Sequence, residues 1–167
     1  MILEKQIPEK VLTYLRSSLA VMPQTYAVLL KGITAEELDA RPYGDRFTLR
    51  EAVAHVADWE GVWLERIRKI ATKETPLLPG YDEAQWAIDH DYAHSDFDAE
   101  MAEIVAGRSA LVSYLNGLDA TAWQRIGRHG ELGAISLFEL TALIAGHDGY
   151  HAQQIIDYRG LNETVAK

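Results

Sequence analysis

The chain has 167 residues, no cysteine, and 25 acidic against 16 basic residues, which gives a formal net charge of −9. A domain of this length buries roughly 68 to 70% of its unfolded surface, so we expect residues 1–167 to form a single domain. The charge argues against nucleic acid as a partner, because a polyanion would be repelled. The lack of cysteine excludes disulfides, thiolate ligands and a cysteine nucleophile, which leaves histidine and carboxylate for metal or acid–base chemistry.

The N-terminal segment carries acidic residues and a proline where a signal peptide needs a continuous apolar stretch. No uninterrupted apolar run reaches the roughly 18 residues that span a bilayer. The sequence therefore predicts a soluble, cytoplasmic protein with no membrane association.

Apolar residues at a spacing of three and four predict a first helix over residues 9–31, followed by Gly32 as a stop. Pro23 lies inside this helix and predicts a kink or a split, because proline removes a backbone donor. Thr48 and Glu51 have the spacing of a capping box, so a second helix is expected from about Leu49 to about residue 70. Residues 75–80 are expected to form a loop.

A short polar helix is expected over residues 82–93 and a third long helix over residues 96–115. Residues 120–135 contain three glycines without a sustained period, and we interpret them as a long connection. Ser136 and Glu139 repeat the capping-box spacing and begin a fourth helix over residues 137–158. The four amphipathic segments and the lack of a convincing strand pattern predict an all-α four-helix bundle. The connection over residues 120–135 is long enough to let the third and fourth helices run parallel.

Two histidines on the fourth helix, His147 and His151, occupy positions where its apolar face continues. Residues four apart project from the same side of a helix, so both imidazoles can reach one ion. Burial leaves their polar nitrogens to be satisfied, and a shared metal would satisfy both. The alternative is a pair of core histidines that are hydrogen-bonded to a carboxylate or to the backbone.

A third ligand is needed, and His55 is the best candidate because it lies beside the apolar face of the second helix. If the three bind one ion, their nearest ring nitrogens should lie within roughly 3 to 4 Å of one another. A rival pair, His90 and His94, lies in an acidic segment without an apolar face, which favours a solvated helix end. His129 either lines the mouth of the site or lies in an exposed loop.

Three stretches resemble the DinB-like metalloprotein superfamily: LLKGITAEELDARP, TLREAVAHVADWE with His55, and ISLFELTALIAGHDGYHAQQI with His147 and His151. The resemblance covers nearly the whole chain and implies that these three histidines hold a divalent metal. It implies zinc or nickel, with manganese or iron as alternatives, in an up-down-down-up bundle that is commonly a homodimer. The family includes S-transferases and isomerases that use low-molecular-weight thiols.

The resemblance favours a metalloenzyme that activates a bound thiol or water for a small-molecule substrate, of the thiol S-transferase type. A metal-dependent hydrolase and a non-catalytic metal- or ligand-binding protein are the alternatives. Side chains within a turn of the proposed ligands could orient an imidazole or bind substrate, although solvated surface charge is the simpler interpretation of the carboxylates. These side chains are Asp58, Glu60, Asp148, Tyr150 and Gln154.

Other residues are candidates for the walls, the entrance and the dimer contact. Trp59, Trp63 and Trp86 are candidates for pocket walls, although tryptophans at helical spacing are more often part of a core. Arg125 and Arg128 are candidates for an anion at the entrance, with solvated surface charge as the alternative. The residues proposed for a homodimer surface are Tyr14, Tyr26, Trp63 and Val112.

Overall fold

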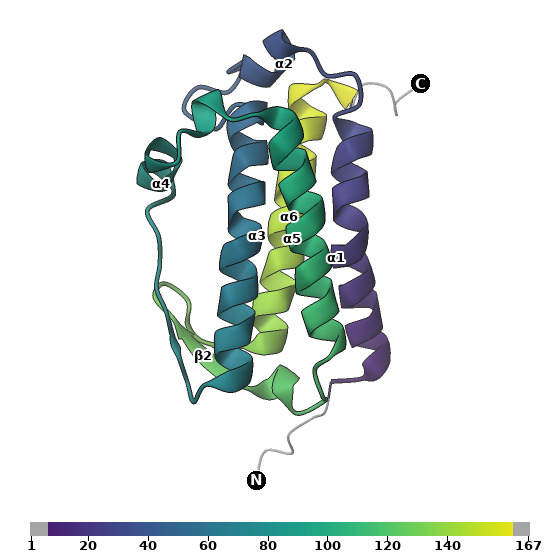
Figure 1. The fold of residues 1–167 in the computed structure, drawn as a ribbon, viewed down its shortest axis with the longest axis vertical. Helices are drawn as coiled ribbons and strands as arrows, with labels where there is room; N and C mark the ends of the chain where they lie inside the picture. The colour runs from purple at the N-terminus through teal and green to yellow at the C-terminus, as the bar shows by residue number, and fades with distance from the viewer. Residues whose placement is uncertain (1–6, 162–167) are drawn as a thin grey trace.

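The computed structural model describes residues 7–161. Its framework is four long helices packed side by side: α1 (Glu9–Leu29), α3 (Leu49–Thr72), α5 (Phe97–Asn116) and α6 (Leu137–Tyr158). Followed along the chain in Figure 1, α1 runs upward, α3 and α5 run downward, and α6 runs upward. The expected all-α bundle with up-down-down-up order is therefore confirmed.

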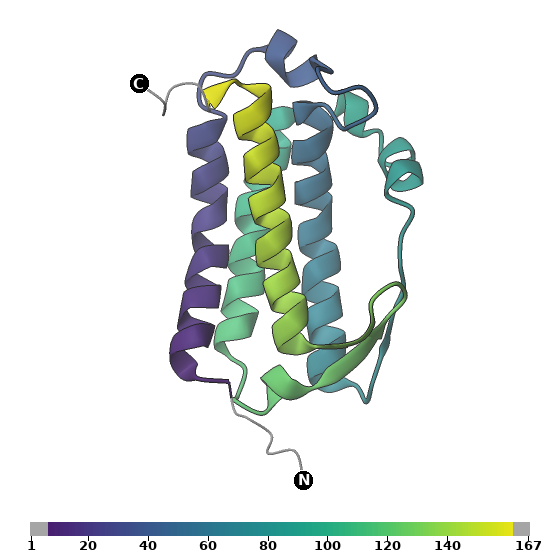
Figure 2. The same cartoon turned by 180° about the vertical axis from the view of Figure 1, so that it is seen from behind.

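The parallel neighbours are α3 and α5, the second and third long helices. Residues 73–96 make this possible, because they return along the outside of the bundle from the lower end of α3 to the upper end of α5 (Figures 1 and 2). The sequence-based idea that residues 120–135 let the third and fourth helices run parallel is wrong. Helices α5 and α6 are antiparallel, and the crossover precedes α5.

The crossover contains a two-residue strand, β1 (Leu77–Leu78), the helix α4 (Glu83–Asp89) and a 3₁₀ turn, η1 (Tyr92–His94). The polar helix expected over residues 82–93 is thus shorter and broken at Asp91, whose φ of 52° is left-handed. Asp82 caps α4 and Asp96 caps α5, since each carboxylate accepts backbone N–H groups of the first turn.

The connection before α6 is not an irregular loop. After the 3₁₀ turn η2 (Ala122–Gln124), strands β2 (Ile126–His129) and β3 (Gly133–Ser136) form an antiparallel hairpin, and β1 pairs parallel with β2. The long connection expected before the last helix is therefore present, and it contains two strands where the sequence shows no convincing strand pattern. A Cβ at Gly130 would lie 2.9 Å from the Gly80 nitrogen, so glycine lets the hairpin approach the crossover.

Both predicted capping boxes form. The Thr48 hydroxyl accepts the N–H of Glu51, the Ser136 hydroxyl accepts that of Glu139, and each glutamate accepts the N–H of its partner. A third box, at Thr34 and Glu37, starts the short helix α2 (Ala35–Asp39), which the sequence analysis did not predict. These caps set where the site-bearing helices α3 and α6 begin.

Helix α1 continues through Pro23, so of the two expected outcomes, a kink or a split, the split does not occur. A proline at position 23 cannot donate to the carbonyl of Leu19, four residues earlier. The Arg108 guanidinium supplies the missing donor, with Nη1 lying 3.0 Å from that carbonyl oxygen. The cost of a proline inside the helix is reduced by this contact from α5.

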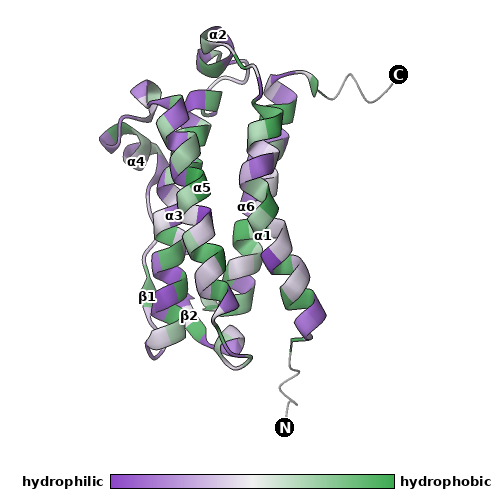
Figure 3. Cartoon of the chain, turned by 45° about the vertical axis from the view of Figure 1, so that its right-hand side comes forward, coloured by the Kyte–Doolittle hydropathy of each residue, from purple (hydrophilic) through white to green (hydrophobic). Residues whose placement is uncertain are grey.

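Hydrophobic and hydrophilic residues both occur along the long helices in Figure 3, as expected for helices with one buried face. The largest buried cluster joins the apolar faces of all four long helices and includes Trp63 and Trp123. A second cluster near α2 contains Tyr26. No helix within residues 7–161 is long and apolar enough to cross a membrane.

Candidate metal centre

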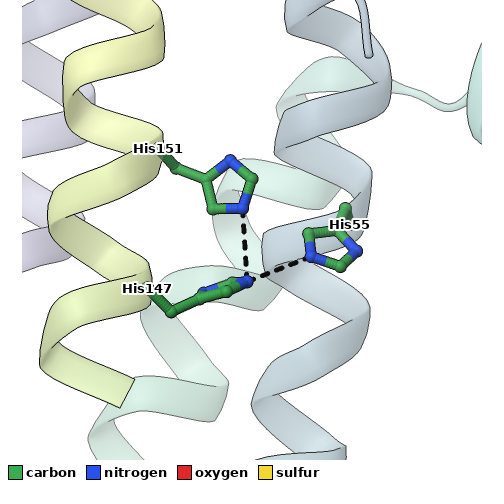
Figure 4. A group of neighbouring side chains, drawn as sticks. All are labelled: His55, His147 and His151. Atoms are coloured by element: carbon green, nitrogen blue, oxygen red, sulfur yellow. Dashed lines mark hydrogen bonds between the residues drawn. The ribbon is translucent and has the colours of Figure 1, made fainter. Parts of the chain in front are cut away.

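Three histidines from two helices point toward one another between α3 and α6 (Figure 4). Nε2 of His147 lies 3.0 Å from Nε2 of His55 and 3.2 Å from Nε2 of His151. Within the described residues they are the one group of three histidine, cysteine or acidic side chains whose donor atoms come together, all within 4.8 Å. The predicted convergence is confirmed, with two of the three nitrogen–nitrogen distances in the expected range of roughly 3 to 4 Å. The alternative, a pair of core histidines hydrogen-bonded to a carboxylate or to the backbone, is not what the described residues show.

The arrangement of the three imidazoles is explained better by a bound metal ion than by hydrogen bonds between the rings. Nε2 of His147 faces two other Nε2 atoms, and a ring nitrogen either donates one hydrogen or accepts at one lone pair. The Nδ1 atoms of His55 and His147 are buried and form no hydrogen bond within residues 7–161. Three lone pairs directed at a common point are what a divalent ion requires.

Gln154 orients one of the imidazoles. Its Oε1 lies 3.1 Å from Nδ1 of His151, and its Nε2 donates to the carbonyl of Phe47 at 3.0 Å. The amide is held by that second bond, so its oxygen accepts from Nδ1–H and leaves the Nε2 lone pair of His151 free. Gln154, one of the five side chains expected to orient an imidazole or to bind substrate, is thus hydrogen-bonded to a proposed ligand.

The three imidazoles are neutral at physiological pH. Burial lowers the pKa of His147 to about 2, of His55 to about 3 and of His151 to about 4, because each charged form would lose its hydration. The positive charge of Arg108 lowers the pKa of His147 further, and that of Arg46 lowers the pKa of His151. A neutral imidazole is the form that binds a metal, so the ligands need no deprotonation at neutral pH.

An open cavity of about 480 Å³ is lined by the three histidines. His55 and His151 are only 2% and 5% exposed and form its floor, whereas Arg46 and Tyr150 are exposed at its rim. The other lining residues are Asp45, Phe47, Glu83, Ala84 and Gln154. A ligand entering from solvent would reach the Nε2 atoms through this cavity.

A second cavity, of about 220 Å³, adjoins the other side of His147. Trp59 and Trp63 line it and also belong to the buried core, so both interpretations of these two residues hold. The Arg66 guanidinium carbon lies 5.2 and 5.3 Å from their ring centroids. His129 also lines this cavity and is buried, so it is a wall residue and not part of an exposed loop. Glu83 lines both cavities.

The pair His90 and His94 does not form a second site. Nδ1 of His90 contacts Asp58 at 2.5 Å, and Nδ1 of His94 contacts Asp91 at 2.7 Å. The same oxygen of Asp58 accepts the Trp86 indole N–H at 2.5 Å and the Tyr92 hydroxyl at 2.9 Å. Asp58 of α3 therefore binds the crossover through three side chains, and Trp86 is one of them.

Glu60 and Asp148 are not solvated surface charges. Both are buried and bind Arg108, whose Nη2 lies 2.6 Å from Glu60 and whose Nη1 lies 2.6 Å from Asp148. Sequence reasoning missed Arg108, although the signal was present: it stands between Ile104 and Leu111 on the apolar face of α5. Burial of a charge at such a position requires partners from other helices.

Arg125 and Arg128 do not lie at the entrance of the histidine cavity. Arg125 donates to the carbonyls of Ile70 and Lys73 and so fixes the end of α3. Arg128 lies in β2, and neither residue lines the two cavities beside the histidines. The cationic residue at the mouth is Arg46, which the sequence analysis did not single out.

The fold and the site define a class: four-helix bundles that gather three histidines at the floor of an open cavity and hold a divalent metal there. The chain belongs to the DinB superfamily, which it matches over residues 18–155. A relative from Oceanobacillus iheyensis, provisionally named a metal-dependent hydrolase, is 29% identical over 120 residues, which is 72% of this chain and 69% of the relative.

Two further similarities agree with this assignment. A provisionally named metal-dependent hydrolase of Bacillus pumilus is 26% identical over 140 residues, which is 83% of this chain and 79% of that relative. The structure of YfiT from Bacillus subtilis, described as a probable metal-dependent hydrolase with an unusual four-helix bundle topology, superposes with a TM-score of 0.87. It is 22% identical, and the match covers 95% of this chain and 92% of YfiT.

Proposed function

We propose that this protein is a metal-dependent hydrolase in which His55, His147 and His151 hold one divalent ion. The observation that carries the proposal is the convergence of three neutral Nε2 atoms at the floor of a solvent-accessible cavity. An ion with three protein ligands and an open position lowers the pKa of a water or thiol that binds to it. Zinc and nickel suit three imidazoles, with manganese and iron as alternatives.

Glu83 is the carboxylate best placed to take up a proton in this site. It lines both cavities that adjoin His147, and it lies in the first turn of α4, the helix that Asp82 caps. Burial raises its pKa, and the nearby charge of Glu131 raises it further. A carboxylate with a raised pKa accepts a proton more readily near neutral pH. We therefore propose Glu83 as the general base.

The thiol S-transferase activity implied by the family resemblance is the rival function. It requires the same three histidines, and because the chain has no cysteine, the thiol must come from a cosubstrate. The names of the relatives support hydrolysis, since those proteins are called metal-dependent hydrolases.

The two functions are separated by reconstituting the untagged protein with zinc or nickel and assaying ester and amide cleavage without thiol. The same samples are then assayed for thiol transfer to an electrophile. Hydrolysis that needs the metal, and that is lost in His147→Ala and strongly reduced in Glu83→Gln, supports the proposal. Turnover that occurs only when a thiol is added would contradict hydrolysis and support S-transfer. No turnover in either assay would indicate a non-catalytic binding protein.

A further inference from the structure

The rim of the histidine cavity carries a hydrogen-bonded pair, Arg46 and Tyr150. Nη2 of Arg46 donates to the Tyr150 hydroxyl at 2.7 Å, and the guanidinium carbon lies 5.5 Å from the tyrosine ring centroid. Tyr150 precedes the ligand His151 on α6, so the pair is fixed relative to the histidines. Both side chains line the cavity on whose floor the imidazoles lie.

The pair keeps hydrogen-bond donors available to a ligand. A guanidinium has five N–H donors, and within residues 7–161 one hydrogen bond is formed by that of Arg46. The Tyr150 oxygen accepts this bond, so its own hydrogen remains free to donate. The loop that carries Arg46 is anchored, because Arg41 donates both to the Arg46 carbonyl and to Glu51 of α3.

The charges of the cavity limit the kind of group that fits these donors. Asp45 and Glu83 line the same cavity, so two carboxylates accompany one guanidinium. At the rim, a doubly charged phosphate would be repelled by these two carboxylates more strongly than a singly charged carboxylate would be. A carboxylate is also planar and matches two parallel N–H donors of arginine.

We propose that Arg46 and Tyr150 bind a carboxylate of the substrate while its reacting group lies at the three histidines. This inference rests on the proposed function, since it assumes that the ion leaves a position open to the substrate. It assigns the substrate to the small molecules that carry a carboxylate a few bonds away from the reacting group. Arg46 and Tyr150 would then determine specificity without taking part in bond cleavage.

Hydroxamates test this assignment, because a hydroxamate binds a metal ion irrespective of the reaction that the ion supports. The probes are butanohydroxamate and succinic monohydroxamate, which match in length and differ in a terminal methyl or carboxylate, together with the phosphonate analogue 3-phosphonopropanohydroxamate. Affinities are measured by calorimetry on the zinc-loaded protein. The wild type should prefer the carboxylate probe over the methyl probe by roughly 10- to 100-fold, the range for hydrogen bonds to a charged group.

The variants locate the preference. Arg46→Gln should bring the ratio of the two affinities close to one and leave the affinity for butanohydroxamate unchanged, and Tyr150→Phe should reduce the ratio in part. Arg128→Gln removes the same charge from β2, away from the cavity, and should keep the full preference. Circular dichroism of each variant confirms that it is folded.

The outcomes that overturn the proposal differ from those that overturn the proposed function. Equal affinities in the wild type, or a preference that survives Arg46→Gln, would remove the carboxylate site while leaving the metal centre intact. Tighter binding of the phosphonate probe than of the carboxylate probe would show that the pair binds a phosphate-like group and not a carboxylate. Failure of every hydroxamate to bind the zinc-loaded protein would overturn the open metal position, and both proposals with it.

Discussion

At the scale of single residues, the position of His151 depends on one amide. Gln154 accepts from Nδ1 of His151 and is itself held by the Phe47 carbonyl. Partners of this kind fix the tautomer and the ring orientation of a ligand, and their loss typically weakens metal binding about 10- to 100-fold.

We therefore expect Gln154→Leu to weaken zinc or nickel binding by about 10- to 100-fold, as measured by competition with a chelator of known affinity. Tyr158→Phe is the matched control, because the Tyr158 hydroxyl donates to the same Phe47 carbonyl at 2.9 Å without touching a ligand. The control should bind metal as the wild type does. Equal affinities of the wild type and Gln154→Leu would show that the amide has no orienting role.

The polar residues near the site show how far the sequence alone can be interpreted. His147 and His151 could be assigned because a four-residue spacing puts both on one helix face, and the face was already defined by apolar neighbours. His55 required the family resemblance, because periodicity does not say which helix lies opposite. Glu60 and Asp148 were misjudged for the same reason: their partner Arg108 lies on a third helix, and that pairing exists only in the folded bundle.

At the scale of helices, Arg108 joins all four long helices. Its guanidinium binds Glu60 of α3, Asp148 of α6 and the Leu19 carbonyl of α1, and its own helix is α5. It thereby helps to hold α3 against α6, the two helices that carry the metal ligands. Removing one partner from a buried ion cluster leaves the remaining charges without compensation.

Arg108→Met should destabilise the protein by about 3 to 5 kcal/mol, because two buried carboxylates lose their shared cation. Chemical denaturation measures this change. The triple replacement Arg108→Met, Glu60→Gln and Asp148→Asn removes all three charges and should recover part of the loss. If Arg108→Met is as stable as the wild type, the cluster does not hold the helices together.

Most of the bundle could be predicted from the sequence, because apolar periodicity and two capping boxes mark α3 and α6 directly. The hairpin β2–β3 could not, since its strands have four residues each and include glycines that mimic a loop. The sequence analysis also put the crossover before the wrong helix, because a long connection allows two helices to be parallel but does not determine which two. Chain direction is fixed by packing across the bundle, and no local pattern records it.

At the scale of the whole molecule, three buried neutral histidines make the stability of the metal-free protein depend on pH. Their pKa values in the folded state lie far below the value of about 6.5 that is usual in an unfolded chain. Below pH of about 6.5 the unfolded state therefore binds protons that the folded state does not, and stability falls as the pH falls.

We expect the metal-free protein to lose stability as the pH is lowered from about 6.5 to about 4, by up to about 1.4 kcal/mol per pH unit for each histidine. Denaturation curves at a series of pH values measure the slope. The triple variant in which His55, His147 and His151 are replaced by alanine supplies the control and should have a flatter profile. Identical profiles would show that the three imidazoles are not neutral and buried in the metal-free fold.

We also propose a homodimer, following the family resemblance. Tyr26 and Trp63 are excluded from its surface because both are buried in the core, whereas Tyr14 is 63% exposed. Exposed apolar residues remain on α1 and α5, including Val21, Val28 and Val105, and Val112 lines a groove between these helices. Burial of such residues against a second copy would remove them from water.

Light scattering at micromolar concentration should report twice the mass of the chain, and Val105→Glu should shift the protein toward the monomer by placing a charge in the contact. Ile88→Glu changes another exposed apolar residue, on α4 and away from α1 and α5, and should leave the dimer intact. A wild-type protein that is a monomer under these conditions would contradict the proposal.

The central claim is that a bundle already stable through its core uses His55, His147 and His151 to hold one divalent ion for function. Metal analysis of untagged wild type and His151→Ala, together with circular dichroism and thermal melts, tests it most directly. We predict about one ion per wild-type chain, none in the variant, and retained helicity with cooperative unfolding at a somewhat lower temperature, because a ligand bound only to the native state stabilises it. Equal metal content in the two proteins, or a variant that is unfolded at room temperature, would contradict the account.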